Sequence, residues 1–586
     1  MELNYILGND NSFYGKFKDD FNAYQNYIPL YEKFFLLKKD NYNKITLNSQ
    51  YSVKKLNSEI SENVFYCTIK DNTNKVNTQN LEFTAPVFFK YSPLIDPIKY
   101  MGGEQELCPL PSFEEKGDKN NIPYVDGFFY FLSSKLLENH GFINGNIFYG
   151  QHLTHKKLLE VDISDDIDYL MNNSHFNTNK EKYNISEEFY DGIEIFISNK
   201  NKRRLQIQRD NEPIAIDTLD INKHLSDINE LFVSPCNSEN INSSLLYESK
   251  VFNGKSSTNV DTTDNAIHRT TSLKSVSSYD SESEDDDSNF AESQNSCSSN
   301  SDAEYTESDS EYSDSSDSNN SGNEHPKLVA KLKDIPINMI GLECYVDTLD
   351  TYIAECDIDN NEMTCILLQV IFTLIGYQKA FRFIHNDLHT NNIMYIPTEY
   401  DYIFYRYNNI NYKVKTYGKL WKIIDYGRGT YKFNNQLMFS SSFDSNGDAS
   451  TQYNCEPYYN PNKKRVDMNY SFDLCRLGCS LYEDLFGNVV VDRDDLNPIE
   501  NVIVDWCLDY KGRNVLIKNN GEERYEEFKL YKMITRTVND HIPQNQLSRD
   551  IFKEHISKNT KVKSKFKKIV VDIDLIKDYS KNQGSQ

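Results

Sequence analysis

A long apolar helix followed at once by a polar loop constrains this chain more than any other feature. Residues Met363 to Phe381 carry apolar side chains on most faces, which predicts a helix that is buried all round. The next residues, His385 to Asn392, read His-Asn-Asp-Leu-His-Thr-Asn-Asn, and Ile393 and Met394 then predict a short strand. A tight loop after a rigid helix holds its polar side chains on one side, so we expect a functional site there.

Asp387 and Asn392 lie five residues apart in this loop. Phosphoryl transfer needs a carboxylate that orients the attacking hydroxyl and accepts its proton, and it needs oxygen ligands for Mg²⁺. An Asp and an Asn at this spacing supply these groups. The alternative is a polar turn that happens to contain both residues.

Two further motifs follow along the chain. An apolar strand, Leu420 to Ile424, leads into Asp425, Tyr426 and Gly427, so a strand delivers an acidic residue that is followed closely by Gly. A common Asp-x-Gly turn after a strand is the alternative. The segment Ser471-Phe-Asp-Leu-Cys-Arg-Leu-Gly478 begins a predicted helix, and the plain interpretation is an amphipathic helix capped by its Asp.

In this order, the three motifs resemble those of the protein-kinase superfamily, written H-R-D-L-x-x-x-N, D-F-G and D-x-W-S-x-G. The resemblance is clear from about Ile335 to Glu483. His389 stands where protein kinases usually carry Lys, so the loop is most similar to haspin-like and small-molecule kinases, which read D-L-H-x-x-N. Asn446-Gly-Asp-Ala449, the lack of an Ala-Pro-Glu motif and the bias toward Asn, Tyr and Lys are similar to kinase-like proteins of large DNA viruses.

The resemblance implies an α+β, two-lobed protein-kinase-like fold with a small β-rich N-lobe, a helical C-lobe and a long disordered acidic insertion in the N-lobe. Together with the residue patterns, it divides the chain into a helical extension (1–50), expected from the amphipathic-looking run Phe21 to Leu37, an N-lobe (51–345), a C-lobe (346–545) and a lysine-rich tail (546–586). The patterns also predict strands at 64–69, 83–90, 146–149 and 335–342, a hairpin at 400–417 and helix from 472 to about 538. Within the N-lobe we expect an irregular insertion at 156–235 and the disordered one at 236–326.

The resemblance also implies a role for each matching residue. Asp387 would orient or deprotonate the acceptor hydroxyl, and Asn392 and Asp425 would hold Mg²⁺. Two residues would have structural roles: His385 would steady the metal-binding turn, and Asp473 would accept hydrogen bonds from the catalytic-loop backbone. The others would contact ATP: His389 would approach the γ-phosphate as a neutral imidazole, and Glu343 to Tyr345 would form the adenine-facing hinge.

The N-lobe carries weaker signals. The strand Ala85-Pro-Val-Phe-Phe-Lys90 looks like the one that bears the phosphate-pairing Lys, and a strand that merely ends in Lys is the alternative. The acidic partner of Lys90 is expected on the next helix, Pro123 to His140, as either Asp126 or Glu138. Residues 50–89 contain no Gly, so no Gly-rich phosphate loop precedes Lys90 at the usual distance, and the match at Leu7 to Gly15 is only superficial.

Composition bounds the remaining possibilities. Of the net charge of −25, fifteen negative charges lie between Asp280 and Glu324, in a stretch rich in Ser, Asp and Glu that contains no Lys or Arg. Such a stretch is expected to be disordered and is a candidate docking segment for basic proteins. The rest of the chain has ordinary acidity, and no direct nucleic-acid binding is expected. Cysteines without CxxC pairs and the lack of a long apolar run predict a soluble intracellular protein, in the host cytoplasm or virion if viral.

We therefore expect an ATP- and Mg²⁺-dependent phosphotransferase that acts on protein Ser or Thr. The first alternative is a pseudokinase, which uses the same fold as a binding module; the Gly-free N-lobe favours it. The second is a small-molecule kinase, suggested by His389.

Overall fold

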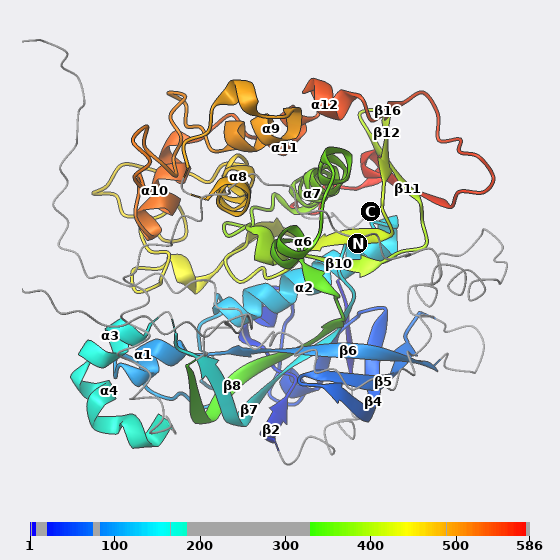
Figure 1. The fold of residues 1–586 in the computed structure, drawn as a ribbon. Helices are drawn as coiled ribbons and strands as arrows, with labels where there is room; N and C mark the ends of the chain where they lie inside the picture. Colours follow the sequence, from blue (N-terminus) through cyan, green and yellow to red (C-terminus); the bar gives the residue numbers. More distant parts are fainter. Residues whose placement is uncertain are drawn as a thin grey trace, which may run out of the picture.

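The computed structural model describes residues 1, 3–7, 20–73, 82–115, 117–164, 166–183, 328–487 and 489–581. The predicted disordered segment 236–326 lies outside the described residues, as do residues 184–235 and the match at 8–15. The described residues form a mixed structure with mainly antiparallel sheets, in agreement with the α+β class. Figure 1 shows the largest sheet in one half of the molecule and most helices in the other, with helix α2 (Ile122–His140) between them.

The largest sheet has six antiparallel strands in the order β2-β7-β8-β6-β5-β4. The strands predicted at 64–69, 83–90 and 335–342 lie within β5, β6 and β8, and the strand predicted at 146–149 overlaps the start of β7. The bounds are β2 (Phe21–Gln25), β4 (Tyr51–Ser61), β5 (Val64–Asp71), β6 (Glu82–Pro93), β7 (Phe148–Asp162) and β8 (Val329–Glu343).

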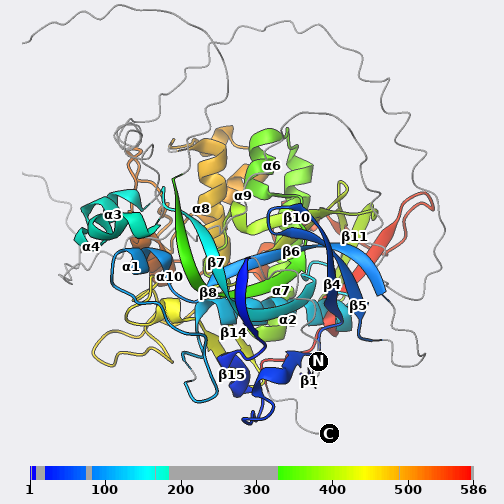
Figure 2. The ribbon, with the colours of Figure 1, turned by 90° about the horizontal axis from the view of Figure 1, so that it is seen from below.

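The two faces of this sheet meet different partners. In β6, the alternate residues Ala85, Val87, Phe89 and Tyr91 are buried in one cluster, together with residues of the short helices α1, α3 and α4. The side chain of Lys90 therefore points to the opposite face, because successive strand residues alternate. Figure 2 shows α1, α3 and α4 beside β7 and β8. Their bounds are α1 (Pro97–Met101), α3 (Ile167–Asn172) and α4 (Ser174–Asn179), followed by the 3-10 turn η4 (Lys180–Tyr183).

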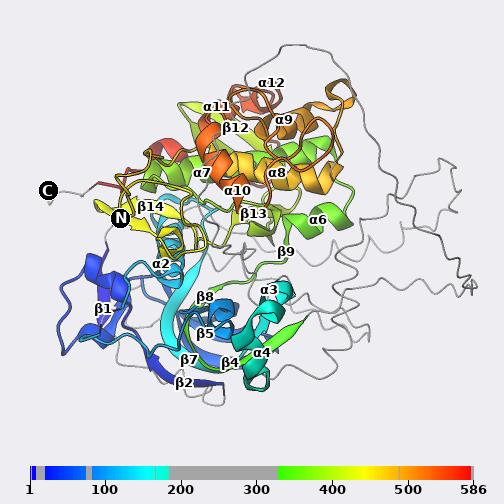
Figure 3. The ribbon, with the colours of Figure 1, turned by 90° about the vertical axis from the view of Figure 1, so that its left-hand side faces the viewer.

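Helix α2 packs against the Lys90 face of the sheet. Its predicted ends are confirmed: Pro123 lies in the first turn, and Gly141 closes the helix in the left-handed conformation at φ 60°. Phe129 of α2 stacks on Phe383 and contacts Tyr426 across the middle of the molecule. Figure 3 shows α2 between the sheet and α7, so it joins the two halves through aromatic contacts.

The helical half is built around α7 (Asn360–Phe381), the buried helix that the apolar pattern predicted. Among the described residues, α7 is the helix that is long and apolar enough to span a bilayer. However, 94% of its most apolar stretch is buried inside the protein. That burial is typical of the core helix of a soluble domain. The other helices are α6 (Leu349–Glu355), α8 (Phe472–Phe486), α9 (Pro498–Trp506), α10 (Phe528–Thr537), α11 (Pro543–Gln546) and α12 (Asp550–Lys553).

The expectation of helix from 472 to 538 was therefore only partly right. Residues 507–527 form turns and isolated bridges between α9 and α10. Gly512 and Gly521 adopt φ values of 73° and 84°, which an α-helix cannot contain, so this stretch folds as a loop.

Small sheets complete the helical half. One has the order β13-β10-β9, and another has the order β16-β12-β11-β17, with the predicted hairpin of 400–417 as β11 and β12. The bounds are β9 (Asp347–Thr348), β10 (Ile393–Pro397), β11 (Tyr402–Tyr407), β12 (Ile410–Lys415), β13 (Lys419–Ile423), β14 (Thr430–Phe433), β15 (Gln436–Phe439), β16 (Ile556–Ser557) and β17 (Lys568–Asp572), with β14 paired to β15.

The predicted helical extension at 1–50 is wrong for its described part, which contains no α-helix. Ile28 is extended before Pro29, as the steric demand of proline requires, and this splits the apparently amphipathic run. Phe21 and its neighbours instead form β2, which pairs with β7. The other elements are β1 (Tyr5–Leu7), β3 (Ile45–Leu47) and the 3-10 turns η2 (Pro29–Lys33) and η3 (Tyr42–Lys44).

The tail at 546–586 is also better integrated than its lysines suggested. Strand β17 pairs in parallel with β11, and residues 573–575 form the 3-10 turn η10. Tyr579 is buried, and its hydroxyl lies 2.6 Å from His140 Nε2 at the end of α2. The tail therefore ties the hairpin and α2 to the helical half.

Candidate active site

The polar loop at 385–392 is held by α8. The carboxylate of Asp473, which is fully buried, accepts hydrogen bonds from the backbone N–H groups of His385 (2.9 Å) and Asn386 (3.0 Å). This is the structural contact expected of Asp473, and it fixes the turn that leads into Asp387. His385 Nε2 donates to the carbonyl of Ile424 (2.8 Å), so the same loop also supports the strand end before Asp425.

Asn392 is oriented by its own loop. Its Nδ2 donates to the carbonyl of Asp387 (2.9 Å) and lies 3.1 Å from His389 Nε2. These contacts occupy the amide nitrogen. No described residue donates a hydrogen bond to Asn392 Oδ1, which leaves this oxygen as the atom suited to a cation.

Lys90 joins residues from three distant segments. Its ammonium lies 2.8 Å from Asp126 Oδ2 and 3.0 Å from Asp425 Oδ1, and its side chain is 24% exposed. Of the two acids considered as partners of Lys90, Asp126 is therefore in contact, whereas Glu138 pairs with Lys135. Burial lowers the pKa of Lys90, but the two carboxylates outweigh it and raise that pKa well above its ordinary value. Lys90 is thus a cation at neutral pH.

Asp425 is held in an unusual backbone conformation. Its φ is 60°, in the left-handed region that residues other than glycine rarely adopt, and such strain tends to be kept where function needs it. Its N–H donates to the hydroxyl oxygen of Tyr130 (2.9 Å), and the next N–H, of Tyr426, donates to Asp126 Oδ1 (2.8 Å). Burial raises the pKa of Asp425, but Lys90 more than offsets this and lowers it, so the carboxylate is ionised.

Asp387 is enclosed by positive and hydroxyl groups. Its side chain is about 1% exposed, its Oδ1 accepts a hydrogen bond from Tyr531 (2.6 Å), and its Oδ2 lies 3.6 Å from Arg428 Nη1. Burial would raise the pKa of Asp387, but Arg428, helped by His389, Arg476 and Tyr531, lowers it to about 2. Asp387 is therefore a carboxylate at any physiological pH.

The sequence analysis missed the residues around Asp387. Arg428, which is 2% exposed, forms an ion pair with Asp448, and Arg476 Nε donates to the hydroxyl of Tyr531 (3.0 Å). The one available signal was that Arg428 follows Asp425-Tyr-Gly directly. Nothing in the local pattern around Tyr531, 144 residues after Asp387, marks it as a neighbour.

His389 lies beside Asn392 and is largely buried. Burial lowers its pKa to about 4, although the charge of Asp387 opposes this. The ring is therefore neutral at pH 7, and its Nε2 can accept the hydrogen bond from Asn392. The positive charge near Asp387 comes from arginine instead.

In the segment predicted as the hinge, the side chain of Glu343 and the main-chain groups of Cys344 and Tyr345 have different surroundings. The carboxylate of Glu343 is fully buried and binds Lys422 Nζ at 2.6 and 2.8 Å, and it also accepts from the N–H of Ile147. This side chain cannot face a nucleotide, because it is used to pair a buried lysine. The main-chain groups of Cys344 and Tyr345, which connect β8 to β9, have no hydrogen-bond partner among the described residues and can still meet a base.

The cluster supplies part of the ligand set that phosphates and a metal ion need. Asp425 and Asn392 offer oxygens, and Lys90 offers the charge that phosphates pair with, so these residues fit Mg²⁺ bound together with a nucleotide. Among the described residues there is no group of three acidic, His or Cys side chains that could hold a metal alone, so phosphate oxygens would have to complete the ligand set. In the β4–β5 hairpin, Asn63 takes the left-handed turn position (φ 60°) and its carbonyl accepts from Phe89 N–H, next to Lys90.

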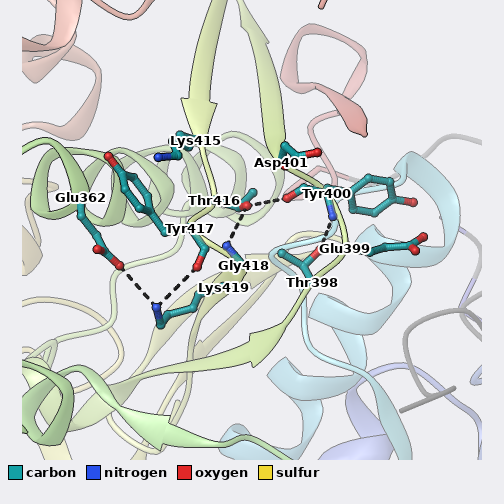
Figure 4. Close-up of a pocket in the computed structure, with 10 residues that line it drawn as sticks. All are labelled: Glu362, Thr398, Glu399, Tyr400, Asp401, Lys415, Thr416, Tyr417, Gly418 and Lys419. Atoms are coloured by element: carbon teal, nitrogen blue, oxygen red, sulfur yellow. Dashed lines mark hydrogen bonds and ion pairs between the residues drawn. The ribbon is translucent and has the colours of Figure 1, made fainter. Parts of the chain in front are cut away.

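A separate surface pocket of about 360 Å³ lies at the base of the β11–β12 hairpin. It is lined by Glu362 and by residues 398–401 and 415–419, and Figure 4 shows Lys419 between the Glu362 carboxylate and the Tyr417 carbonyl. None of the residues around Asp387 or Lys90 lines it. The candidate active site is therefore the polar cluster between the two halves and not this pocket.

No protein-family profile matches the chain, and no curated protein is significantly similar to it. The assignment of function consequently depends on the geometry of this cluster.

Proposed function

We propose that this protein is an ATP- and Mg²⁺-dependent phosphotransferase whose acceptor is a Ser or Thr hydroxyl of a protein. The observation that carries the proposal is the contact of the Lys90 ammonium with both Asp126 and Asp425, although Lys90 and Asp425 are 335 residues apart. A lysine on a strand that follows a β-hairpin, paired to an acid on a later helix and facing an Asp that could bind metal, resembles the arrangement that protein kinases use for ATP.

The remaining residues take complementary roles in the proposed reaction. Asp387 accepts the proton of the acceptor hydroxyl while the oxygen of that hydroxyl bonds to the γ-phosphorus. The bond from the γ-phosphorus to the β,γ-bridging oxygen breaks in the same step. Asn392 and Asp425 would hold Mg²⁺, which when bound neutralises charge on the phosphates. Lys90 would pair with the phosphates, and the neutral His389 would approach the transferred group. Asp387 is ionised at physiological pH, so it carries no proton of its own when the acceptor hydroxyl approaches and can orient that hydroxyl by a hydrogen bond.

A binding module without catalysis is the second candidate, and two observations favour it. Asp387 is covered by Tyr531, and the hairpin beside Lys90 lacks the glycines that let backbone amides approach phosphates closely. Such a protein would bind a nucleotide weakly or not at all. Measurements of nucleotide binding and of phosphate transfer, made separately, distinguish the two candidates.

Nucleotide binding is tested by thermal melting with increasing Mg-ATP. Wild type is expected to melt at higher temperature as ligand is added, whereas Lys90→Met and Asp425→Asn should lose most of this shift. Lys156→Met is a matched control, because Lys156 lies in the same sheet but stacks on Tyr91 and Phe21. If Lys90→Met keeps the full shift while Lys156→Met loses it, Lys90 is not the phosphate ligand.

Catalysis is tested with labelled ATP and a mixed library of Ser and Thr peptides. Asp387→Asn should keep the Mg-ATP shift and lose transfer by a factor of about 10² or more, because it removes the proton acceptor. Transfer by Asp387→Asn at the wild-type rate would exclude the proposed chemistry. Absence of transfer by wild type, with weak nucleotide binding or none, would favour the binding module.

A further inference from the structure

Tyr531 makes the hydrogen bond that an acceptor hydroxyl is expected to make. Its phenolic O–H donates to Asp387 Oδ1 at 2.6 Å, within the range over which a general base takes a proton from its substrate. Tyr531 is 3% exposed and belongs to α10, which is not part of the loop at 385–392. The candidate base is thus already engaged by a hydroxyl from the same chain.

Two arginines shape the position of this hydroxyl. Arg476 Nε donates to the Tyr531 oxygen at 3.0 Å, and the guanidinium carbons of Arg428 and Arg476 lie 5.5 and 5.4 Å from the centre of its ring. The other carboxylate oxygen of Asp387 faces Arg428. Arg428 Nη1 lies 3.6 Å from Asp387 Oδ2, as an ion pair that is longer than a hydrogen bond, and the buried Arg428 Nε has no hydrogen-bond partner among the described residues. Buried donors are normally paired, so the unpaired Nε and the long Nη1 contact beside Asp387 point to a group that binds there in another state.

We propose that the position of the Tyr531 hydroxyl is the acceptor subsite, and that Tyr531 is its built-in occupant, which must turn away before a Ser or Thr hydroxyl can reach Asp387. This inference rests on the proposed phosphotransferase function. Once Tyr531 leaves, Arg476 Nε loses its acceptor, so the vacated subsite offers donors from both arginines beside the base. Such donors suit an acceptor oxygen and the phosphoryl oxygens that approach it.

The start of α10 suits a movable element. Glu527, which precedes the helix, has φ 47° and ψ −131°, a strained backbone for a residue that is not glycine. The loop 507–527 leads into it through turns and isolated β-bridges and contains no regular helix or strand. Phe528 stacks on Tyr531 with ring centres 5.6 Å apart and is itself only half-buried, so the ring pair lies close to the surface.

The position of Tyr531 over Asp387 is tested by an experiment that does not depend on catalysis. Wild type, Tyr531→Phe and Tyr531→Ala are treated with a water-soluble carbodiimide and glycine ethyl ester, and the label on Asp387 is measured by mass spectrometry. We expect at least tenfold more label in Tyr531→Ala and a smaller increase in Tyr531→Phe. Asp473 is fully buried and reports unfolding if it also becomes labelled. Equal labelling of Asp387 in all three proteins overturns the proposal; if Tyr531→Ala unfolds, Tyr531→Phe, which retains the ring, decides the matter.

A matched variant controls for the loss of a buried phenol. Tyr482 lies in α8, and its hydroxyl donates to the Val489 carbonyl at 2.7 Å without contact to Asp387. Tyr482→Phe should therefore leave the labelling of Asp387 unchanged. An increase equal to that of Tyr531→Phe would mean that any loosening of this region exposes Asp387, and the specific role of Tyr531 would be refuted.

Phosphate transfer from Mg-ATP to the peptide library tests the subsite itself. Tyr531→Phe and Tyr531→Ala are expected to raise kcat/KM for peptides about tenfold or more, with KM for ATP unchanged. A fall to the level of Asp387→Asn would overturn the proposal, because Tyr531 would then be a working part of the site. If no variant transfers phosphate although labelling of Asp387 rises, the phosphotransferase function fails, while Tyr531 still stands as the cover of Asp387.

Discussion

Replacement of Arg428 by Met is the sharpest test of the electrostatics around Asp387. At 3.6 Å, opposite unit charges attract by about 5 kcal/mol at an effective dielectric constant of about 20. Much of that attraction offsets the cost of burying Asp387. Removal of one partner from a buried ion pair typically costs about 3–5 kcal/mol, so we expect Arg428→Met to lower the free energy of unfolding by this amount at pH 7.

The loss should depend on pH in a defined direction. In wild type, the pKa of Asp387 is about 2, below its ordinary value, so its ionisation contributes about 2 kcal/mol of stability above pH 4, which disappears as the pH falls toward 2. Without Arg428, burial should raise this pKa above the value in the unfolded chain. The ionised group then opposes folding at pH 7, and this penalty vanishes as the pH falls and the group becomes protonated. The difference in free energy of unfolding between wild type and Arg428→Met should therefore become smaller from pH 7 to pH 4.

Urea denaturation at several pH values between 4 and 7 measures this difference. Arg465→Met is the control, because Arg465 pairs with Asp467 on the surface, where an ion pair contributes little; no measurable loss is expected from it. A loss in Arg428→Met that is the same at pH 4 and pH 7 would refute the assignment to Asp387. So would a loss no larger than that of the control.

Two further predictions concern the support of the site. Lys422→Met should lower the free energy of unfolding by about 3–5 kcal/mol, because it leaves the Glu343 carboxylate buried and unpaired. Adding Glu343→Leu should restore part of the lost stability, as measured by urea denaturation. A double variant no more stable than Lys422→Met would contradict this prediction. Tyr579→Phe removes the contact with His140 at the end of α2, worth about 1 kcal/mol, and should speed hydrogen exchange of the last turn of α2, residues 137–140. Unchanged exchange there would show that the tail does not hold this helix.

Features that depend on neighbouring residues could be predicted from the sequence. The apolar pattern of α7, the proline and glycine that bound α2, and the alternation in β6 are local, because helices and strands repeat over two to four residues. The loop at 385–392 was predictable for the same reason. Asp387 and Asn392 stand in this loop, and the contact of Asn392 with the Asp387 carbonyl is local. The contact of Asp473 with the loop joins residues 88 apart and was expected only from the resemblance to protein kinases.

Contacts between distant segments were not predictable. The pairing of β2 with β7 and of β17 with β11 turned an expected helix and an expected loose tail into strands, since an edge strand offers hydrogen bonds that local preference cannot anticipate. The choice of Asp126 over Glu138 was decided by how α2 rotates against the sheet. The environment of Asp387 arose in the same way, because Arg428 lies between β13 and β14 and Tyr531 lies on α10, and only tertiary packing brings both to Asp387.

The sequence by itself therefore determined the order of the chemical groups along the chain and the elements that carry them. Tertiary structure alone decided which charges are neutralised, which carboxylate is covered and which backbone groups are left open. The physical reason is that burial and charge pairing depend on distance in space, and a sequence pattern describes only distance along the chain.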